Sequence, residues 1–146
     1  MKSSTLIDAN VLIDVLGIEG LAGRNWSLAA LKQCLDDGAI VFSAVVWAEL
    51  SSPAIQDALL ARALAWLRPQ REDFPFAAAH TAGVAHRLYR QRGGGRERTL
   101  PDFLIGAHAQ VSGHRLLTRD PKRYRTYFPD LEIIAPDTHP MAGSSA

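Results

Sequence analysis

The sequence is poor in cysteine and has no long apolar run. Its one cysteine in 146 residues, Cys34, can form neither an internal disulfide nor a four-cysteine zinc site. The apolar N-terminal stretch is interrupted by Asp8 and Asp14 and lacks a small-residue cleavage signal, and no segment approaches the roughly 20 apolar residues of a membrane span. We therefore expect a protein of the reducing cytoplasm that has no place in a membrane.

Net charge is also low, at +1, but it is unevenly distributed. Residues 87–125 contain ten of the sixteen lysines and arginines and only three acidic residues. Such an uneven charge distribution is typical of a protein that binds a polyanion with one face, although a merely solvated surface gives the same pattern. Within this stretch, the arginine- and glycine-rich segment 90–99 predicts a mobile, exposed basic loop.

Strand and helix periods alternate along the chain, which predicts one α/β domain with a mainly parallel sheet. We expect that domain at 1–136 and a disordered tail at 137–146. The strands are predicted at 4–8, 39–43, 115–118 and 131–135. The helices are predicted at 10–16, 28–37, 45–50, 53–67, 77–90 and 99–112, with the polar stretch 68–75 as a loop.

Four acidic residues stand directly against apolar sequence: Asp8 in TLIDANVLI, Glu49 in VVWAEL, Asp102 in LPDFLIGAHA and Asp120 in LLTRDP. Carboxylates are rarely buried unless their charge is compensated. Two of them about 4 Å apart repel by roughly 4 kcal/mol at an effective dielectric of about 20. Ligands of open parallel sheets gather outside the carboxyl ends of the strands, so the pattern predicts a Mg²⁺ or Mn²⁺ site of oxygen ligands at that edge.

Each acid taken singly has another interpretation. Asp8 and Asp102 suit the starts of helices, Asp120 precedes a proline as in many turns, and Glu49 can face solvent. The combination favours a site, because four acids without a cysteine or histidine cluster match the preference of hard divalent ions. The reaction that such a site suits is phosphodiester hydrolysis.

The segments LIDANVLIDVL, VVWAEL, LPDFLIGAHA and LLTRDPKRY resemble, in order and spacing, the four motif regions of PIN-domain nucleases, especially the small VapC-type toxins of bacterial toxin–antitoxin pairs. The resemblance implies a compact α/β/α sandwich around a parallel sheet. It also implies that Asp8, Glu49, Asp102 and Asp120 hold Mg²⁺ or Mn²⁺, and that Asn10 and Thr118 support the site by hydrogen bonding.

The same resemblance implies partners. They are an RNA substrate that the protein cleaves as a metal-dependent endoribonuclease, a second copy of the chain in a homodimer, and a cognate antitoxin that covers the active site. Two alternatives remain open, a PIN-like module that only binds a partner and a phosphatase of the haloacid dehalogenase type. The phosphatase also begins with an aspartate after its first strand, but here Asn10 stands where it has a second aspartate.

Arginines and histidines receive lesser roles than the acids. Arginines near the acids are expected to contact the RNA backbone, with simple solubility as the alternative: Arg92, Arg96, Arg98 and Arg119. Four histidines recur in pairs six residues apart, which is not the i, i+4 spacing of a helical zinc pair, so we assign no ligand role to them: His80, His86, His108 and His114.

Overall fold

The computed structural model describes residues 3–141, and within them the chain builds a five-stranded sheet. Neighbouring strands run parallel throughout, in the order β3-β2-β1-β4-β5. The strands are β1 (Thr5–Ile7), β2 (Ile40–Ser43), β3 (Gln70–Glu72), β4 (Arg115–Leu117) and β5 (Ile133–Ile134). The predicted α/β class with a mainly parallel sheet is confirmed.

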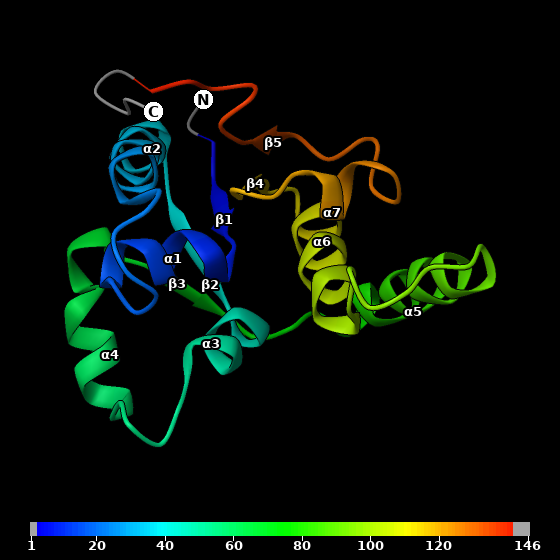
Figure 1. Cartoon of the computed structure of the whole chain (residues 1–146), viewed down its shortest axis with the longest axis horizontal. Coiled ribbons are helices and arrows are strands. Elements are labelled where there is room, and N and C mark those ends of the chain that lie inside the picture. Colours follow the sequence, from blue (N-terminus) through cyan, green and yellow to red (C-terminus); the bar gives the residue numbers. More distant parts are fainter. Residues whose placement is uncertain (1–2, 142–146) are drawn as a thin grey trace.

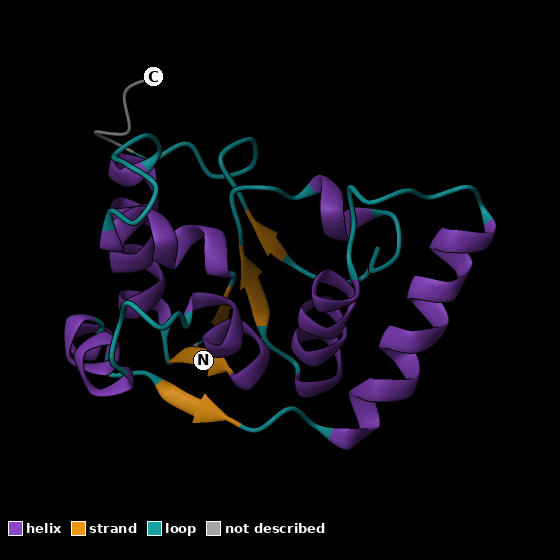
Figure 2. Cartoon of the chain, turned by 60° about the horizontal axis from the view of Figure 1, so that its bottom comes forward, coloured by secondary structure: helices purple, strands orange, loops and turns teal. Residues whose placement is uncertain are grey.

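Helices cover both faces of this sheet. They are α1 (Ala9–Leu16), α2 (Arg24–Asp37), α3 (Ala44–Leu50), α4 (Asp57–Ala63), α5 (Phe76–Gln91), α6 (Leu100–Ser112) and α7 (Lys122–Arg125), with a 3₁₀ turn at Ala65–Leu67. Figure 1 and Figure 2 show the strands between α1, α2 and α4 on one side and α5 and α6 on the other. Helix α1 packs on α2, and α5 packs on α6. This is the predicted α/β/α sandwich.

Strand β1 lies at the centre of the sheet, and this position determines where the acids can meet. All three of its residues are completely buried, as expected for a parallel strand covered on both faces. Leu6 is in register with Val41 of β2 and with Leu116 of β4. The residues that follow β1, β2 and β4 therefore lie at one edge of the sheet.

Helix α2 begins four residues earlier than predicted. Ser27, which directly precedes the predicted helix 28–37, is buried within α2, and its hydroxyl donates to Oδ2 of Asp14 on α1 (2.6 Å). The N-cap is instead Gly23, whose φ of 78° lies in the left-handed region that favours glycine. The predicted end of the helix before Gly38 is correct.

Helix α4 is shorter than the predicted helix 53–67. Residues Ser52 and Ile55 form an isolated antiparallel bridge, which holds the intervening Pro53 in a turn, and the helix begins only at Asp57. It ends at Ala63, after which the chain continues into the 3₁₀ turn.

Strand β3 lies within the predicted polar loop. Its residues are exposed or half-buried and carry no apolar side chain, since it pairs with β2 alone and forms one margin of the sheet. An edge strand of this kind has no hydrophobic alternation by which to recognise it. Its last residue, Glu72, is in register with Ser43.

The predicted tail, 137–146, divides into two parts. Asp137 forms two hydrogen bonds with the guanidinium of Arg125 (2.7 and 2.9 Å), and the carbonyl of His139 accepts from Nε1 of Trp26 (2.9 Å). The remainder, 142–146, lies outside the described residues. Among residues 3–141, no helix has the length and apolar character needed to cross a membrane.

Candidate metal centre

Asp8 follows β1 directly and is almost completely buried, with 5% of its surface exposed. It caps α1, since Oδ1 accepts from the backbone N–H of Ala9 (2.7 Å). Oδ2 accepts from the hydroxyls of Thr118 and Tyr124, each at 2.8 Å. The capping interpretation of this aspartate and the site interpretation are therefore compatible, because a carboxylate has about four acceptor positions.

Burial raises the pKa of Asp8, and the negative charge of Asp102 adds to this rise. The hydrogen bonds from Tyr124, Thr118 and Ala9 lower it, but burial outweighs them. Burial also raises the pKa of Tyr124 well above its usual value, and the charge of Asp8 adds to it, so the phenol stays protonated and donates.

Asp102 comes from helix α6, which lies on the other side of the sheet from the helix α1 that Asp8 caps (Figure 1). It lies in the first turn of α6 and is 3% exposed. Oδ2 accepts from the backbone N–H of Thr99 (2.8 Å) and from its hydroxyl (3.2 Å), which fixes the carboxylate at the helix start. Oδ1 accepts from Nη1 of Arg123 (3.3 Å).

Arg123 lies among the acids, although no role is predicted for it from its sequence context. Its Nε donates to Oδ2 of Asp120 (2.8 Å) while Nη1 contacts Asp102. Partial burial lowers its pKa, but the charges of Asp102, Asp120 and Asp8 outweigh this and raise it. The guanidinium side chain is 44% exposed and so can reach solvent as well as the acids.

Glu49 projects from α3 into the same electrostatic environment, although it is exposed. Its pKa rises to about 7, first because neighbouring atoms partly desolvate it and then because of the charges of Asp8 and Asp102. Arg123 lowers it to a smaller extent. Four carboxylates thus share the influence of one guanidinium.

Thr118 and Asn10 connect the acids to one another. The hydroxyl of Thr118 donates to Asp8 and accepts from Nδ2 of Asn10 (3.3 Å) and from the backbone N–H of Asp120 (3.0 Å). Oδ1 of Asn10 accepts from the backbone N–H of Arg119 (3.2 Å). All the hydrogen-bonding positions of this one hydroxyl are therefore used within the site.

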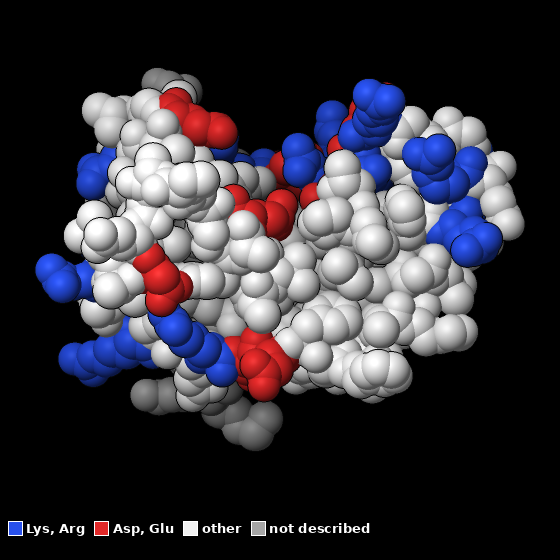
Figure 3. Space-filling view, turned by 90° about the horizontal axis from the view of Figure 1, so that it is seen from below, with Lys and Arg blue, Asp and Glu red and all other residues white. Residues whose placement is uncertain are grey.

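Basic side chains border the acids. Arg98 donates from Nη2 to the carbonyl of Lys122 (2.8 Å) and lies over the ring of Tyr89. A hollow of about 350 Å³ beside them is lined by Glu97, Arg98, Asp120, Lys122 and Arg123. Figure 3 views this end of the molecule and shows acidic atoms in a central depression with basic side chains along one flank.

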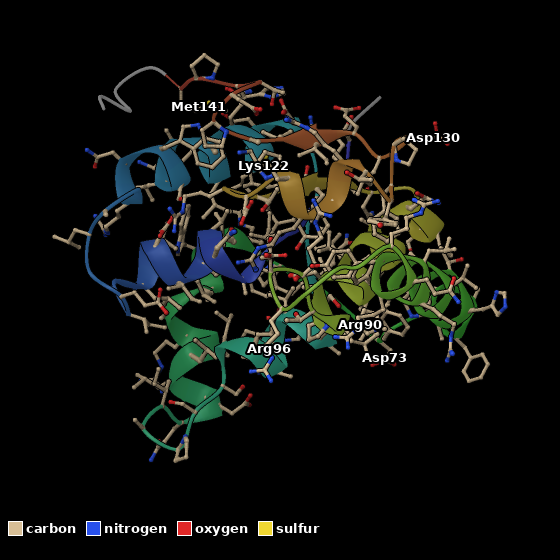
Figure 4. The ribbon with its side chains drawn as sticks, turned by 45° about the vertical axis from the view of Figure 1, so that its right-hand side comes forward. Asp73, Arg90, Arg96, Lys122, Asp130 and Met141 are labelled. Atoms are coloured by element: carbon tan, nitrogen blue, oxygen red, sulfur yellow. The ribbon has the colours of Figure 1, made fainter. Side chains whose placement is uncertain are left out.

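The remaining predicted arginines lie in different surroundings. Arg92 lies over the ring of Tyr127, with its guanidinium carbon 5.8 Å from the ring centre, and Arg96 is exposed on the loop before α6, as Figure 4 shows. Arg119 forms an ion pair through Nε with the buried carboxylate of Asp14. Asp14, which binds both Arg119 and Ser27, is a second residue that the sequence did not indicate, because no neighbouring residue marks it as a partner of either.

The PIN domain family matches residues 5–129, a range that includes all four acids. This chain belongs to the PIN domain family. The phosphatase alternative is thereby excluded. None of the curated proteins with which the sequence was compared matches it.

Several solved structures have a similar fold. VapBC2 from Rickettsia felis, bound to a DNA fragment from its promoter, has a TM-score of 0.69 at 18% identity, over 90% of this chain and 98% of that chain. VapBC-1 from nontypeable Haemophilus influenzae gives 0.67 at 19%, over 90% and 97%. A toxin–antitoxin complex from Klebsiella pneumoniae gives 0.65 at 23%, also over 90% and 97%. At these identities the likeness shows a shared fold.

The donor set of this PIN domain fits Mg²⁺ or Mn²⁺. Asp8 and Asp102 are buried, and each is held from behind by protein hydroxyl or N–H donors. The four acids outnumber the one guanidinium of Arg123, and the charges of Asp8 and Asp102 add to the rise in the pKa of Glu49 that desolvation causes. Hard divalent ions prefer oxygen ligands and would neutralise that charge.

Proposed function

We propose that this chain is a Mg²⁺- or Mn²⁺-dependent endoribonuclease, and that it is the toxin of a toxin–antitoxin pair. PIN domains are generally nucleases, and the observation that carries the proposal is one network of acids: Thr118 links Asp8, which follows β1, to Asp120, and Arg123 links Asp120 to Asp102 of α6. Asp8, Asp102, Glu49 and Asp120 would hold the cation. When bound, it would supply charge neutralisation at the scissile phosphate and a more acidic water.

The chain's own residues would position the substrate. Thr118 and Asn10 fix the orientation of Asp8, and Tyr124 holds a proton against its Oδ2. Arg98 and Lys122 line the hollow beside Asp120, where they can bind phosphate oxygens of an RNA backbone. Such contacts give affinity without reading bases. Arg92, Arg96 and Arg119 extend this basic surface.

Partner proteins follow from the same comparison. The structure from Klebsiella pneumoniae is a toxin–antitoxin complex by name, and those from Rickettsia felis and Haemophilus influenzae are named VapBC, so we expect a cognate antitoxin that blocks the acids. We also expect a homodimer. Large apolar side chains remain exposed on α5, including Phe76 at 93%, which supports burial of part of this surface in an assembly.

The deciding experiment is cleavage of total RNA with mapping of the new ends. We expect cleavage in Mg²⁺ or Mn²⁺ that stops on addition of EDTA and in Asp102→Asn. The matched control is Asp130→Asn, an exposed aspartate that Figure 4 shows at the periphery of the molecule, which should cleave as the unchanged chain does. Cleavage of equal rate in Asp102→Asn would refute the proposal.

The alternative of a module that only binds a partner makes a different prediction. Its acids would serve folding alone, so calorimetric titration with Mn²⁺ would show no binding that depends on Asp8 or Asp102. Mn²⁺ binding that is lost in Asp102→Asn would contradict this alternative.

A further inference from the structure

Three potential metal ligands converge at a place outside the acidic site. Glu72 is at the end of β3, His108 lies within α6, and His114 comes directly before β4. One ligand atom from each lies within 4.8 Å of the other two. The three residues come from separate elements, so the fold and not a local motif brings them together.

The reversal of the chain after α6 explains why the two histidines meet. Helix α6 ends at Ser112, and Gly113 has a φ of 73°, in the left-handed region. The backbone N–H of His114 then donates back to the carbonyl of Ala109 (2.9 Å). The rings of His108 and His114 are consequently 6.3 Å apart between centres. The six-residue spacing argued against a pair only on the assumption of a continuous helix.

Both imidazoles point the same nitrogen at one atom. Nε2 of His108 is 3.0 Å and Nε2 of His114 is 2.9 Å from Oε1 of Glu72. In a tetrahedral zinc site with bonds of about 2.0–2.1 Å, neighbouring ligand atoms are about 3.4 Å apart. The two distances to Oε1 would therefore have to lengthen by only a few tenths of an ångström, and the two nitrogens, within 4.8 Å of each other, lie close enough to share an ion.

The other nitrogen of each ring is held by a serine. Nδ1 of His108 is 3.1 Å from the hydroxyl of Ser43, and Nδ1 of His114 is 2.6 Å from that of Ser4. Ligating histidines almost always have such an outer partner, which fixes the orientation of the ring. The Ser43 oxygen already accepts from the backbone N–H of Val45 (3.2 Å) and has a second lone pair for an Nδ1–H donor.

Burial and charge favour the ligating forms of these side chains. His108 is fully buried, and this burial lowers its pKa, so the neutral imidazole predominates near pH 7 although Glu72 opposes the shift. Burial pulls the pKa of Glu72 upward, but hydrogen bonds from His114 and His108 outweigh it and leave the pKa below its usual value. Cation binding needs a neutral imidazole and an ionised carboxylate.

An entry path and a place for water exist beside Glu72. Its side chain is 31% exposed, and a hollow of about 190 Å³ next to it is lined by Ser43, Trp47 and Asp73, among others. Figure 4 shows Asp73 at the surface of the molecule. Three protein ligands with an open fourth position are a common form of zinc coordination.

We propose that Glu72, His108 and His114 form a second cation site, one that takes Zn²⁺ or a similar borderline ion. Two imidazoles and a carboxylate suit such ions, whereas the oxygen ligands of the acidic site suit Mg²⁺ or Mn²⁺. The bound ion joins the edge strand β3 to α6 and to the start of β4. Its role is to stabilise this side of the fold, and it goes beyond the nuclease function.

The direct test is titration of the full chain with Co²⁺, whose visible absorption reports tetrahedral nitrogen and oxygen ligands, followed by displacement with Zn²⁺. The Asp102→Asn chain serves as the background, so that the acidic site contributes less. We expect one equivalent of Co²⁺ with tetrahedral absorption. The unchanged chain is titrated beside it, so the result does not depend on the folding of the variant. No such absorption in either chain at submillimolar protein would overturn the proposal.

Variants then assign the ligands. His114→Gln and Glu72→Gln should weaken Zn²⁺ binding at least about 10-fold, and His80→Gln, which alters an exposed histidine on α5, should leave it unchanged. An excess of Zn²⁺ of about 100 times Kd should raise the Tm of the unchanged chain by about 5 °C and that of His114→Gln by much less. Equal Zn²⁺ affinity in all three variants would mean that the three residues form only a hydrogen-bonded cluster.

Discussion

The two clusters of polar side chains at this sheet differ in how their charge is balanced. Around Asp8 and Asp102 the negative charge exceeds what Arg123 supplies, and the pKa of Glu49 rises to about 7. Around Glu72 all four imidazole nitrogens have a partner, and the pKa of the carboxyl falls below its usual value. The first cluster is therefore incomplete without a cation, whereas the second is satisfied and would exchange two hydrogen bonds for metal bonds.

The largest expected effect is a separation of the two sites by single substitutions. Asp8→Asn should lower RNA cleavage by about 10²–10³-fold and abolish Mn²⁺ binding, because it removes the central buried carboxylate, while Zn²⁺ binding stays. Glu72→Gln should weaken Zn²⁺ binding and leave RNA cleavage and Mn²⁺ binding unchanged. RNA cleavage assays and calorimetry with both ions measure this. A parallel loss of both ions in either variant would show that the clusters are one unit.

Substitution of Thr118 should have the next largest effect. Thr118→Val keeps the shape but leaves Asp8, Asn10 and the N–H of Asp120 without their shared partner. Loss of a buried network costs about 2 kcal/mol, or a fall in Tm of about 4–8 °C. Thermal unfolding measures it, with the exposed Thr126→Val as the matched control. Equal Tm values in the two variants would count against a connecting role for Thr118.

The sequence predicted the acidic site better than the histidine cluster for a physical reason. Asp8 and Thr118 follow buried strands, and Asp102 begins a helix with a recognisable cap, so local pattern alone places them at one edge. The assignment of the four acids as ligands nevertheless stays a prediction.

Side chains from irregular or polar segments were not predictable in this way. Glu72 lies on an edge strand without apolar residues, and His114 meets His108 only because Gly113 reverses the chain. Arg123 and Tyr124 lie on the short helix α7, and the direction of their side chains depends on how that helix packs. Such contacts are tertiary, and periodicity carries no information about them.

Removal of the Arg123 guanidinium should increase the excess of negative charge in the acidic site. Arg123→Gln leaves Asp102 and Asp120 without their cation, so the Tm without divalent ions should fall by about 2–4 °C, the equivalent of about 1 kcal/mol for a half-exposed pair. The rise in Tm on adding Mn²⁺ should be larger than in the unchanged chain. Arg125→Gln, which breaks an exposed pair with Asp137, is the control and should change little.

The smallest effect concerns Glu49 and depends on pH. Its folded pKa of about 7 lies above the ordinary 4.5, so between these values the folded state binds more protons than the unfolded one. Stability without divalent ions therefore falls as pH rises through this window. Glu49→Gln cannot ionise, and it should raise the Tm at pH 8 by about 2 °C after allowance for solvent screening, but leave it unchanged at pH 4.5.

Addition of Mn²⁺ should reverse the sign of the Glu49 effect. If the carboxylate is a ligand, its repulsion by Asp8 and Asp102 becomes attraction to a shared ion, and Glu49→Gln should then be less stable than the unchanged chain at pH 8. The same pair of scans with Zn²⁺ should show no reversal, since Glu72 and the histidines hold that ion. A stabilising effect of Glu49→Gln that persists in Mn²⁺ would remove Glu49 from the metal site and leave it as a carboxylate that only repels its neighbours.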